Sequence, residues 1–164
     1  MDTVVLIDDK VIDFFSSEMV LLKVNAEVDT ALAKSYHISG YPTIVLTDSK
    51  GEEIDRIVGY RPADEFLQTL ENYKNGIGTL DDLLSKADTS ENRNLYFEIA
   101  DKYKYRGGVE EAKNWYKKVI DAGEPTDSLS GESRLSIADM YRRAIDYDKS
   151  LEAFNKTMKD FKGT

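Results

Sequence analysis

The side chains that most often carry out chemistry are scarce in this sequence. It contains no cysteine and a single histidine, His37. Without thiols the chain can supply no disulfide, no thiolate nucleophile and no thiolate metal ligand. One histidine is also too few for a zinc site, and no serine is marked as the nucleophile of a Ser–His–Asp triad. We therefore expect no catalytic residue, no metal and no cofactor.

Pairs of carboxylates are the remaining candidates for acid–base chemistry. Such a pair needs burial that separates its two pKa values. The pairs considered are Asp8-Asp9, Glu52-Glu53, Asp81-Asp82 and Glu110-Glu111. Three of them stand beside turns or at the starts of predicted helices, where capping and the helix dipole already favour acidic residues. We expect these carboxylates to be solvated rather than catalytic.

The elements that would position a site in residues 1–75 alternate between helix and strand. Met19–Val24 is rich in branched and apolar residues and predicts a buried strand. A tight turn at Asp48–Gly51 predicts a hairpin. The full order is a helix after Asp8 or Asp9 that ends at Ser16-Ser17, a strand over 19–24, a helix from Asp29, strands over 44–46 and 53–58, and a helix from Pro62.

A family likeness is centred on one proline. Gly40-Tyr41-Pro42-Thr43 stands directly before a predicted strand. The accompanying residues are Lys23-Val24-Asn25-Ala26-Glu27, Leu32-Ala33, Tyr36, Gly51 and Gly59. In these residues the chain resembles the thioredoxin family from its redox-active helix onward. The resemblance implies an α/β fold and a cis peptide bond before Pro42. It also implies that Tyr41, Pro42 and Thr43 bind an extended peptide by strand addition.

The redox motif of that family is missing. The resemblance places its C-x-x-C, at a helix N-terminus, in the stretch that would lie just before Met1. The first strands of the family fold and its central strand are absent as well. Loss of a central strand leaves the flanking strands with unpaired edges. We therefore expect a rearranged sheet, or a homodimer that completes the sheet by strand exchange.

A repeat follows in residues 76–164. Ile99-Ala100-Asp101-Lys102-Tyr103 recurs 38 residues later as Ile137-Ala138-Asp139-Met140-Tyr141. Ala112 and Tyr116 of the first copy match Ser150 and Phe154 of the second. The pattern resembles the tetratricopeptide repeat, a pair of antiparallel helices with a period of about 34 residues. The two copies are expected at about residues 93–124 and 131–162, with the extra residues in a loop at 124–131. Thr79 is expected to cap a helix that lies before the first copy of the repeat.

In tetratricopeptide arrays the first helix of each repeat lines a concave, peptide-binding groove. The resemblance therefore implies a groove lined by eight residues: Asn94, Phe97, Asp101 and Lys104 from the first copy, and Leu135, Asp139, Arg142 and Arg143 from the second. Arg142 and Arg143 are suited to bind a peptide carboxylate. The alternative is a solvated polar face, because two repeats make only a short groove.

The charge balance limits the partners that this chain can bind. Its 164 residues include 31 acidic and 22 basic side chains, a formal net charge of −9. Nucleic acid is therefore excluded as a partner, and a basic protein or peptide is favoured. No apolar run approaches the ~18 residues of a membrane span, and residues 1–25 show no signal peptide. We expect a soluble protein, cytoplasmic as it stands and exported if a signal precedes Met1.

Together these patterns predict an α/β chain with a truncated thioredoxin-like segment at residues 1–75 and a helical, tetratricopeptide-like region at 76–164. The function expected of it is that of a non-catalytic protein-interaction module. Two alternatives stay open. The chain is a fragment of a thiol–disulfide oxidoreductase whose C-x-x-C lies upstream of Met1, or it is a structural homodimer whose strands interlock.

Overall fold

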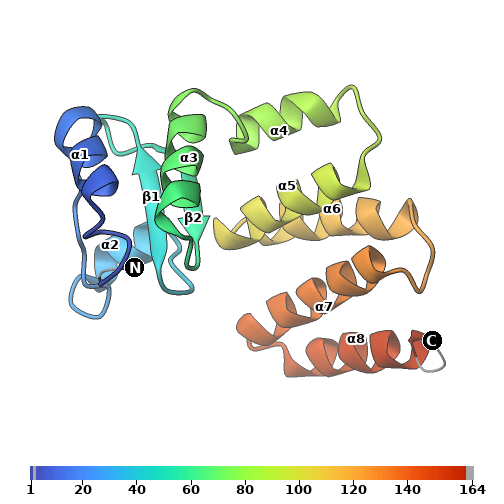
Figure 1. Cartoon of the computed structure of the whole chain (residues 1–164). Coiled ribbons are helices and arrows are strands. Elements are labelled where there is room, and N and C mark those ends of the chain that lie inside the picture. Colours follow the sequence, from blue (N-terminus) through green and yellow to red (C-terminus); the bar gives the residue numbers. More distant parts are fainter. Residues whose placement is uncertain (2, 162–164) are drawn as a thin grey trace. The chain divides into compact units, whose positions relative to one another are not determined.

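The structure is a computed structural model that describes residues 1 and 3–161 (Figure 1). The chain divides into two compact units, Met1–Asp82 and Leu83–Thr164. The first holds a two-stranded antiparallel sheet with helices, and the second is helical. The predicted fold class, a truncated α/β segment followed by a helical region, is confirmed. No helix among the described residues is both long and apolar enough to cross a membrane.

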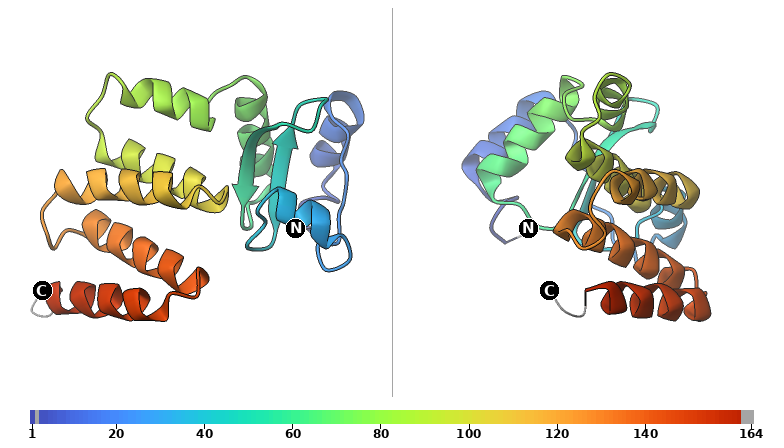
Figure 2. Two further views of the ribbon diagram at one scale, coloured as in Figure 1. Left: turned by 180° about the vertical axis from the view of Figure 1, so that it is seen from behind. Right: turned by 90° about the vertical axis from the view of Figure 1, so that its right-hand side faces the viewer.

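The first unit is built on one hairpin. Its elements are α1 (Asp9–Glu18), α2 (Thr30–Ser35), β1 (Thr43–Thr47), β2 (Glu53–Val58) and α3 (Ala63–Lys74). The two strands pair with Thr43 opposite Val58 and Val45 opposite Arg56. Helices α1 and α3 pack against each other, and α3 packs on β2 (Figures 1 and 2). The apolar core of this unit consists of Val5, Val11, Ile57, Phe66 and Leu70.

Local signals place the helix starts as predicted. The Asp8 carboxylate accepts from the Lys10 amide at 3.0 Å, and the Asp29 carboxylate accepts from the Leu32 amide at 3.1 Å. Thr79 caps α4 (Leu80–Ala87): its hydroxyl accepts from the Asp82 amide at 3.3 Å, and Asp82 accepts from the Gly78 amide at 2.7 Å. The first bond satisfies an amide that the first turn of a helix leaves without a partner, and the second ties the preceding residue to the helix start.

The predicted end of the first helix is wrong by a residue or two. Ser16 and Ser17 remain inside α1, which continues to Glu18. Their hydroxyl groups donate to the carbonyl oxygens of Ile12 and Asp13, at 2.7 and 3.0 Å. Each bond spans four residues, so the two serines are accommodated within the helix instead of ending it.

The predicted strand at Met19–Val24 is also wrong. The segment has no strand pairing and lies largely on the surface. Val20 is 96% exposed and Leu22 is 74% exposed. An apolar run forms a buried strand only where neighbouring strands flank it, and the described sheet consists of β1 and β2 alone. The sequence pattern is that of a strand whose partners are not in this sheet.

The second unit contains four further helices in two hairpins. They are α5 (Arg93–Tyr105), α6 (Val109–Asp121), α7 (Ser128–Arg143) and α8 (Tyr147–Asp160). Helix α5 packs on α6, α7 packs on α8, and α7 also contacts both α5 and α6. The helices follow one another as a stack (Figure 2). A core of Ala100, Ala112, Tyr116 and Met140 joins α5, α6 and α7.

The predicted loop at residues 124–131 is shorter than expected. Ser128–Gly131 form the first turn of α7, because Asp127 caps that helix and accepts from the Ser130 amide at 2.9 Å. Gly131 permits a close approach of α8: a Cβ atom there would lie 2.8 Å from the ring of Phe161. The extra residues between the two copies of the repeat therefore lengthen a helix.

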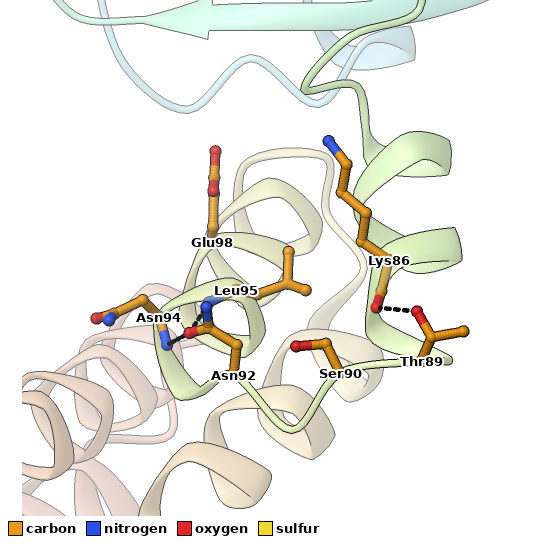
Figure 3. Close-up of a pocket in the computed structure, with 7 residues that line it drawn as sticks. All are labelled: Lys86, Thr89, Ser90, Asn92, Asn94, Leu95 and Glu98. Carbon is orange, nitrogen blue, oxygen red and sulfur yellow. Dashed lines mark hydrogen bonds between the residues drawn. The ribbon is translucent and has the colours of Figure 1, made fainter.

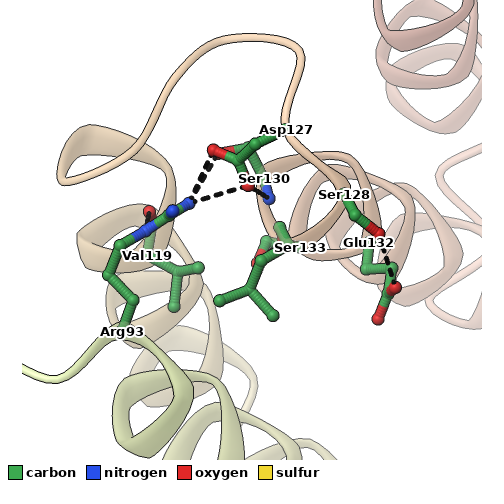
Figure 4. A network of polar contacts seen from close by, with 8 residues as sticks. Arg93, Val119, Asp127, Ser128, Ser130, Glu132 and Ser133 are labelled. Carbon is green, nitrogen blue, oxygen red and sulfur yellow. Dashed lines mark hydrogen bonds and ion pairs between the residues drawn. The ribbon is translucent and has the colours of Figure 1, made fainter.

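Arg93 at the start of α5 ties this cap to α6 (Figure 4). Its Nε donates to the Val119 carbonyl at 2.9 Å, and its guanidinium binds Asp127 at 3.0 Å and Ser130 Oγ at 2.9 Å. The Ser130 amide and the Arg93 guanidinium lower the pKa of Asp127 to about 2. Gly123 leaves room for this network, because a Cβ atom there would lie 1.9 Å from the Arg93 guanidinium and would displace that side chain.

The chain leaves α5 and α7 through the same left-handed turn but with different residues in it, which leads to a prediction about stability. After α5 the chain turns through Gly107 with φ 80°, and after α7 the equivalent residue is Ile145 with φ 63°. A β-branched residue is disfavoured in this left-handed region. Ile145→Gly is expected to raise the free energy of unfolding by about 1 kcal/mol, as measured by urea unfolding at low protein concentration. Gly107→Ala is the matched control and should lower it; stabilisation by the control would contradict the interpretation.

Candidate peptide-binding surfaces

The loop that enters β1 holds the residues predicted to bind a peptide. The Tyr41–Pro42 peptide bond is cis. Tyr41 is 71% exposed, and Pro42 and Thr43 are half-buried. Thr43 Oγ1 donates to the Gly40 carbonyl at 2.8 Å, which closes the loop on itself. The aromatic ring of Tyr41 therefore stands free at the start of the strand.

The outer edge of β1 is open next to this loop. The Gly59 amide donates to the Pro42 carbonyl at 2.8 Å, and hydrogen-bonded pairs alternate along an antiparallel ladder. The backbone of Ile44 therefore faces β2, and the N–H and C=O groups of Thr43 and Val45 face the other side. No further strand of the described chain pairs there. This edge can accept an extended peptide as a third strand.

The predicted groove residues of α5 turn largely inward. The ring of Phe97 stacks edge-on against Tyr116, with 5.5 Å between ring centroids. The Tyr116 hydroxyl binds the Asp101 carboxylate, and Lys104 Nζ lies 2.5 Å from the same carboxylate. Burial and the adjacent Asp101 charge raise the pKa of Tyr116, so this phenol stays protonated and donates. These side chains hold α5 against α6, and Asn94 alone of the four is exposed.

The predicted groove residues of α7 form a second cluster. Asp139 accepts from Arg142 Nε at 2.8 Å and from Arg143 Nε at 2.6 Å. Burial by itself raises the pKa of Asp139, but hydrogen bonds from the two arginines outweigh it and lower that pKa. A peptide carboxylate would have to compete with Asp139 for these guanidinium groups. Leu135 lies on the same helix and is 43% exposed.

One open pocket lies at the start of α5, with a volume of about 430 Å³ (Figure 3). Asn94 is the one predicted groove residue in its wall; the other lining residues are Lys86, Thr89, Ser90, Asn92, Leu95 and Glu98. Asn92 Oδ1 is engaged by the Asn94 and Leu95 amides, at 3.0 and 3.4 Å. The side chains of Lys86 and Glu98 extend to the same side, away from Thr89 and Ser90 (Figure 3). The pocket is a polar depression between a helix end and a helix start.

The residues considered for metal binding and acid–base chemistry form no common site in the part of the chain that the structure describes. No three histidine, aspartate or glutamate side chains gather there as a potential metal site. His37 is exposed and follows α2 with φ 53°. Asp8, Asp81 and Asp82 stand at helix starts, and Glu110 pairs with Lys113 at 2.7 Å.

A comparison with known families matches the region that contains Pro42 and β1. Residues 3–74 match the family model of a thioredoxin-like domain. The chain contains a thioredoxin-like domain. No curated protein and no solved structure is significantly similar to the chain. The family match ends before α4, so the helical unit is characterised by its own geometry.

The thioredoxin-like domain holds two features that sequence reasoning missed in part. The open edge of β1 was expected in general terms, but the side on which it lies follows only from the register of the hairpin. The exposure of Val20–Val24 was not foreseen. In the helical unit the Asp139–Arg142 and Asp139–Arg143 pairs were visible in the sequence, because they are three and four residues apart on one helix. The pocket beside Asn92 had no signal beyond a capping residue.

Proposed function

We propose that the chain is a non-catalytic protein-interaction module that binds an extended segment of a partner protein. One observation carries the proposal: in a thioredoxin-like domain without a cysteine, the outer edge of β1 is open beside the exposed ring of Tyr41. An added strand would bond to the backbone of Thr43 and Val45, and such main-chain bonds provide affinity with little dependence on the partner's sequence.

Charge suggests the chemistry of the partner. Residues Met1–Asp82 contain 16 acidic and 7 basic side chains, whereas Leu83–Thr164 contain 15 of each. The net charge of −9 therefore belongs entirely to the unit that holds β1. Complementary charge accelerates encounter and disfavours partners of like sign. We infer that the bound segment is basic.

The helical unit supports the same role as a pair of tetratricopeptide-like repeats. The 38-residue offset in the sequence aligns α5 with α7 and α6 with α8, and both pairs pack as hairpins. Leu135 and the two arginines of α7 are solvent-accessible on the first helix of the second repeat. A peptide on this face would contact an apolar side chain and a guanidinium pair that Asp139 holds in place.

The absence of thiols gives a direct prediction of inactivity in disulfide exchange. The chain is expected to leave the rate of insulin reduction by dithiothreitol unchanged, because exchange requires an attacking thiolate and the chain has none. The measurement is the onset of insulin turbidity with and without the protein. Earlier turbidity than with dithiothreitol alone would refute a non-catalytic role for this chain.

The proposed strand addition predicts that the chain binds a basic extended peptide. The test uses a fluorescent nine-residue peptide of alternating lysine and valine. We expect saturable binding by anisotropy, and little binding of the corresponding glutamate–valine peptide. Val45→Pro removes one outward N–H of β1 and spares the bonds to β2, so it should weaken binding about tenfold.

The matched control is Val45→Ala, which keeps the N–H and should bind within about twofold of the parent. Amide exchange at residues 53–58 shows whether the hairpin survives each substitution. Equal affinity of the proline and alanine variants would remove β1 as the site, and no binding by the parent chain would remove the proposal.

A structural homodimer by strand exchange is a second candidate, favoured by one observation. Val20, Leu21 and Leu22 are 96%, 44% and 74% exposed in an extended segment that has no strand partner. This segment of a second copy is suited to add to the β1 edge. Leu22→Lys would then abolish dimerisation and leave the fold unchanged.

A further inference from the structure

Helix α8 packs on α7 through one face and leaves a second, apolar face exposed. The first packs on α7: Ser150 Oγ donates to the Ala138 carbonyl at 2.9 Å, Thr157 is buried, and the Phe161 ring lies against Gly131. The second face carries Tyr147, Leu151 and Met158, which are 63%, 62% and 61% exposed. These three, with half-buried Phe154 at their edge, follow the i, i+4, i+7, i+11 spacing of one helical stripe.

In the first repeat, the equivalent face of α6 packs against the next helix. The 38-residue offset maps Leu151, Phe154 and Met158 of α8 onto Lys113, Tyr116 and Ile120 of α6. On α6 this face is covered by α7: Tyr116 is fully buried in a cluster with Met140, and Lys113 Nζ lies 4.9 Å from the centroid of the Tyr141 ring. The equivalent face of α8 is therefore a helix-docking face. Helix α8 lies at one end of the stack (Figure 2), and this face of it is exposed.

We propose that this stripe of α8 pairs with the same stripe of a second copy of the chain, as an antiparallel helix pair about a two-fold axis. The residues are self-complementary in that arrangement. An axis between Glu152 and Ala153 brings Tyr147 opposite Met158 of the second copy. The same axis brings Leu151 opposite Phe154 of the second copy. Both contacts occur twice, as an isologous interface requires.

Charge complementarity fits the antiparallel orientation. Asp148 and Lys159 lie on one flank of the stripe, eleven residues or about three turns apart. Nearly the same axis brings Asp148 of each copy opposite Lys159 of the other, because equal flanks of two helices meet in an antiparallel pair, whereas a parallel pair would place these flanks on opposite sides and lose both ion pairs. The helical unit has 15 acidic and 15 basic side chains, so two copies meet there without net repulsion.

A single helix pair makes a small interface, so the dimer is expected to be weak, with a Kd on the order of 10 µM. The test is sedimentation velocity of the full chain from about 5 to 500 µM, and a concentration-dependent shift from monomer to dimer is expected. Leu151→Glu should leave the chain monomeric throughout. Leu22→Lys, on the exposed segment of the other unit, is the matched control and should dimerise like the parent. Circular dichroism of each variant reports whether its helices are retained.

A charge exchange tests the geometry. Asp148→Lys and Lys159→Asp should each weaken the dimer several-fold, and the double variant should restore it. A chain that is monomeric at every concentration overturns the proposal, and so does a dimer that Leu151→Glu leaves intact. Loss of the dimer in Leu22→Lys alone would assign it to strand exchange. Failure of the double variant to recover would exclude the antiparallel arrangement. None of these outcomes depends on whether β1 binds a peptide.

Discussion

Tyr116→Ala is expected to lower the free energy of unfolding of the helical unit by about 3–5 kcal/mol. Tyr116 is fully buried at the centre of the core that joins α5, α6 and α7. Truncation leaves a cavity among Ala100, Ala112 and Met140, and the small alanine side chains cannot fill it. It also takes the phenol donor away from Asp101. Trp115, the only tryptophan, lies beside Tyr96 at 5.4 Å between ring centroids, so its fluorescence reports urea unfolding of this unit.

Tyr116→Phe separates the two contributions. It keeps the ring and its contact with Phe97 but removes the hydroxyl donor to Asp101. Lys104 still pairs with Asp101, so a loss of about 1 kcal/mol is expected. If the phenylalanine variant loses as much stability as the alanine variant, the polar contact rather than packing dominates at this position, and the assignment of Tyr116 to the core is wrong.

Phe66→Ala is expected to have the largest effect in the first unit, again about 3–5 kcal/mol. Phe66 is fully buried between α1 and β2, and among the described residues the other buried members of its core are Val5, Val11, Ile57 and Leu70. Its ring centroid lies 6.2 Å from that of Phe15. A small core has little apolar area to spare, so loss of one aromatic ring removes a large share of its stability. Amide exchange at residues 53–58, compared with the parent protein, measures the loss.

Phe66→Leu is the matched control, since it retains most of the buried apolar volume. It should cost no more than about 1.5 kcal/mol. Exchange rates that are equal in the parent and in the alanine variant would show that β2 is held by something other than the contact with α3.

The fold could be predicted wherever a signal is local. Asp8, Asp29 and Thr79 cap helices because each side chain bonds an amide two or three residues ahead. The hairpin turn is equally local: the Asp48 carboxylate accepts from the Lys50 and Glu52 amides, and Gly51 adopts φ 83°. These contacts need nothing from the rest of the chain.

Predictions failed where a distant partner decides the outcome. Met19–Val24 has the composition of a buried strand, but composition cannot supply a neighbouring strand. Ser128–Gly131 has the composition of a loop, yet it is helical because Arg93, 34 residues before the capping Asp127, fixes the cap and because Gly131 accepts the Phe161 ring. Serine and glycine at a close helix crossing are not distinguishable from a loop by propensity alone.

The predicted groove residues show the same difference between local signals and contacts with distant partners. The cluster of Asp139 with Arg142 and Arg143 follows from helical spacing. The inward turn of Phe97 and Asp101 depends on Tyr116, which belongs to the next helix. Helical periodicity identifies which residues share a face, but only the packing of α6 decides that this face of α5 is interior.

The uneven division of charge between the two units also governs how the protein tolerates acid. At neutral pH the excess carboxylates keep bare Val20 and Leu22 of different molecules apart by mutual repulsion. Near pH 4.7, the isoelectric point of the sequence, the molecule as a whole carries no net charge, so repulsion between whole molecules disappears. In mildly acidic buffer protonation of carboxylates removes negative charge from the amino-terminal unit, whereas the helical unit, balanced at neutral pH, becomes net positive. Precipitation would therefore start at the exposed apolar side chains of the amino-terminal unit.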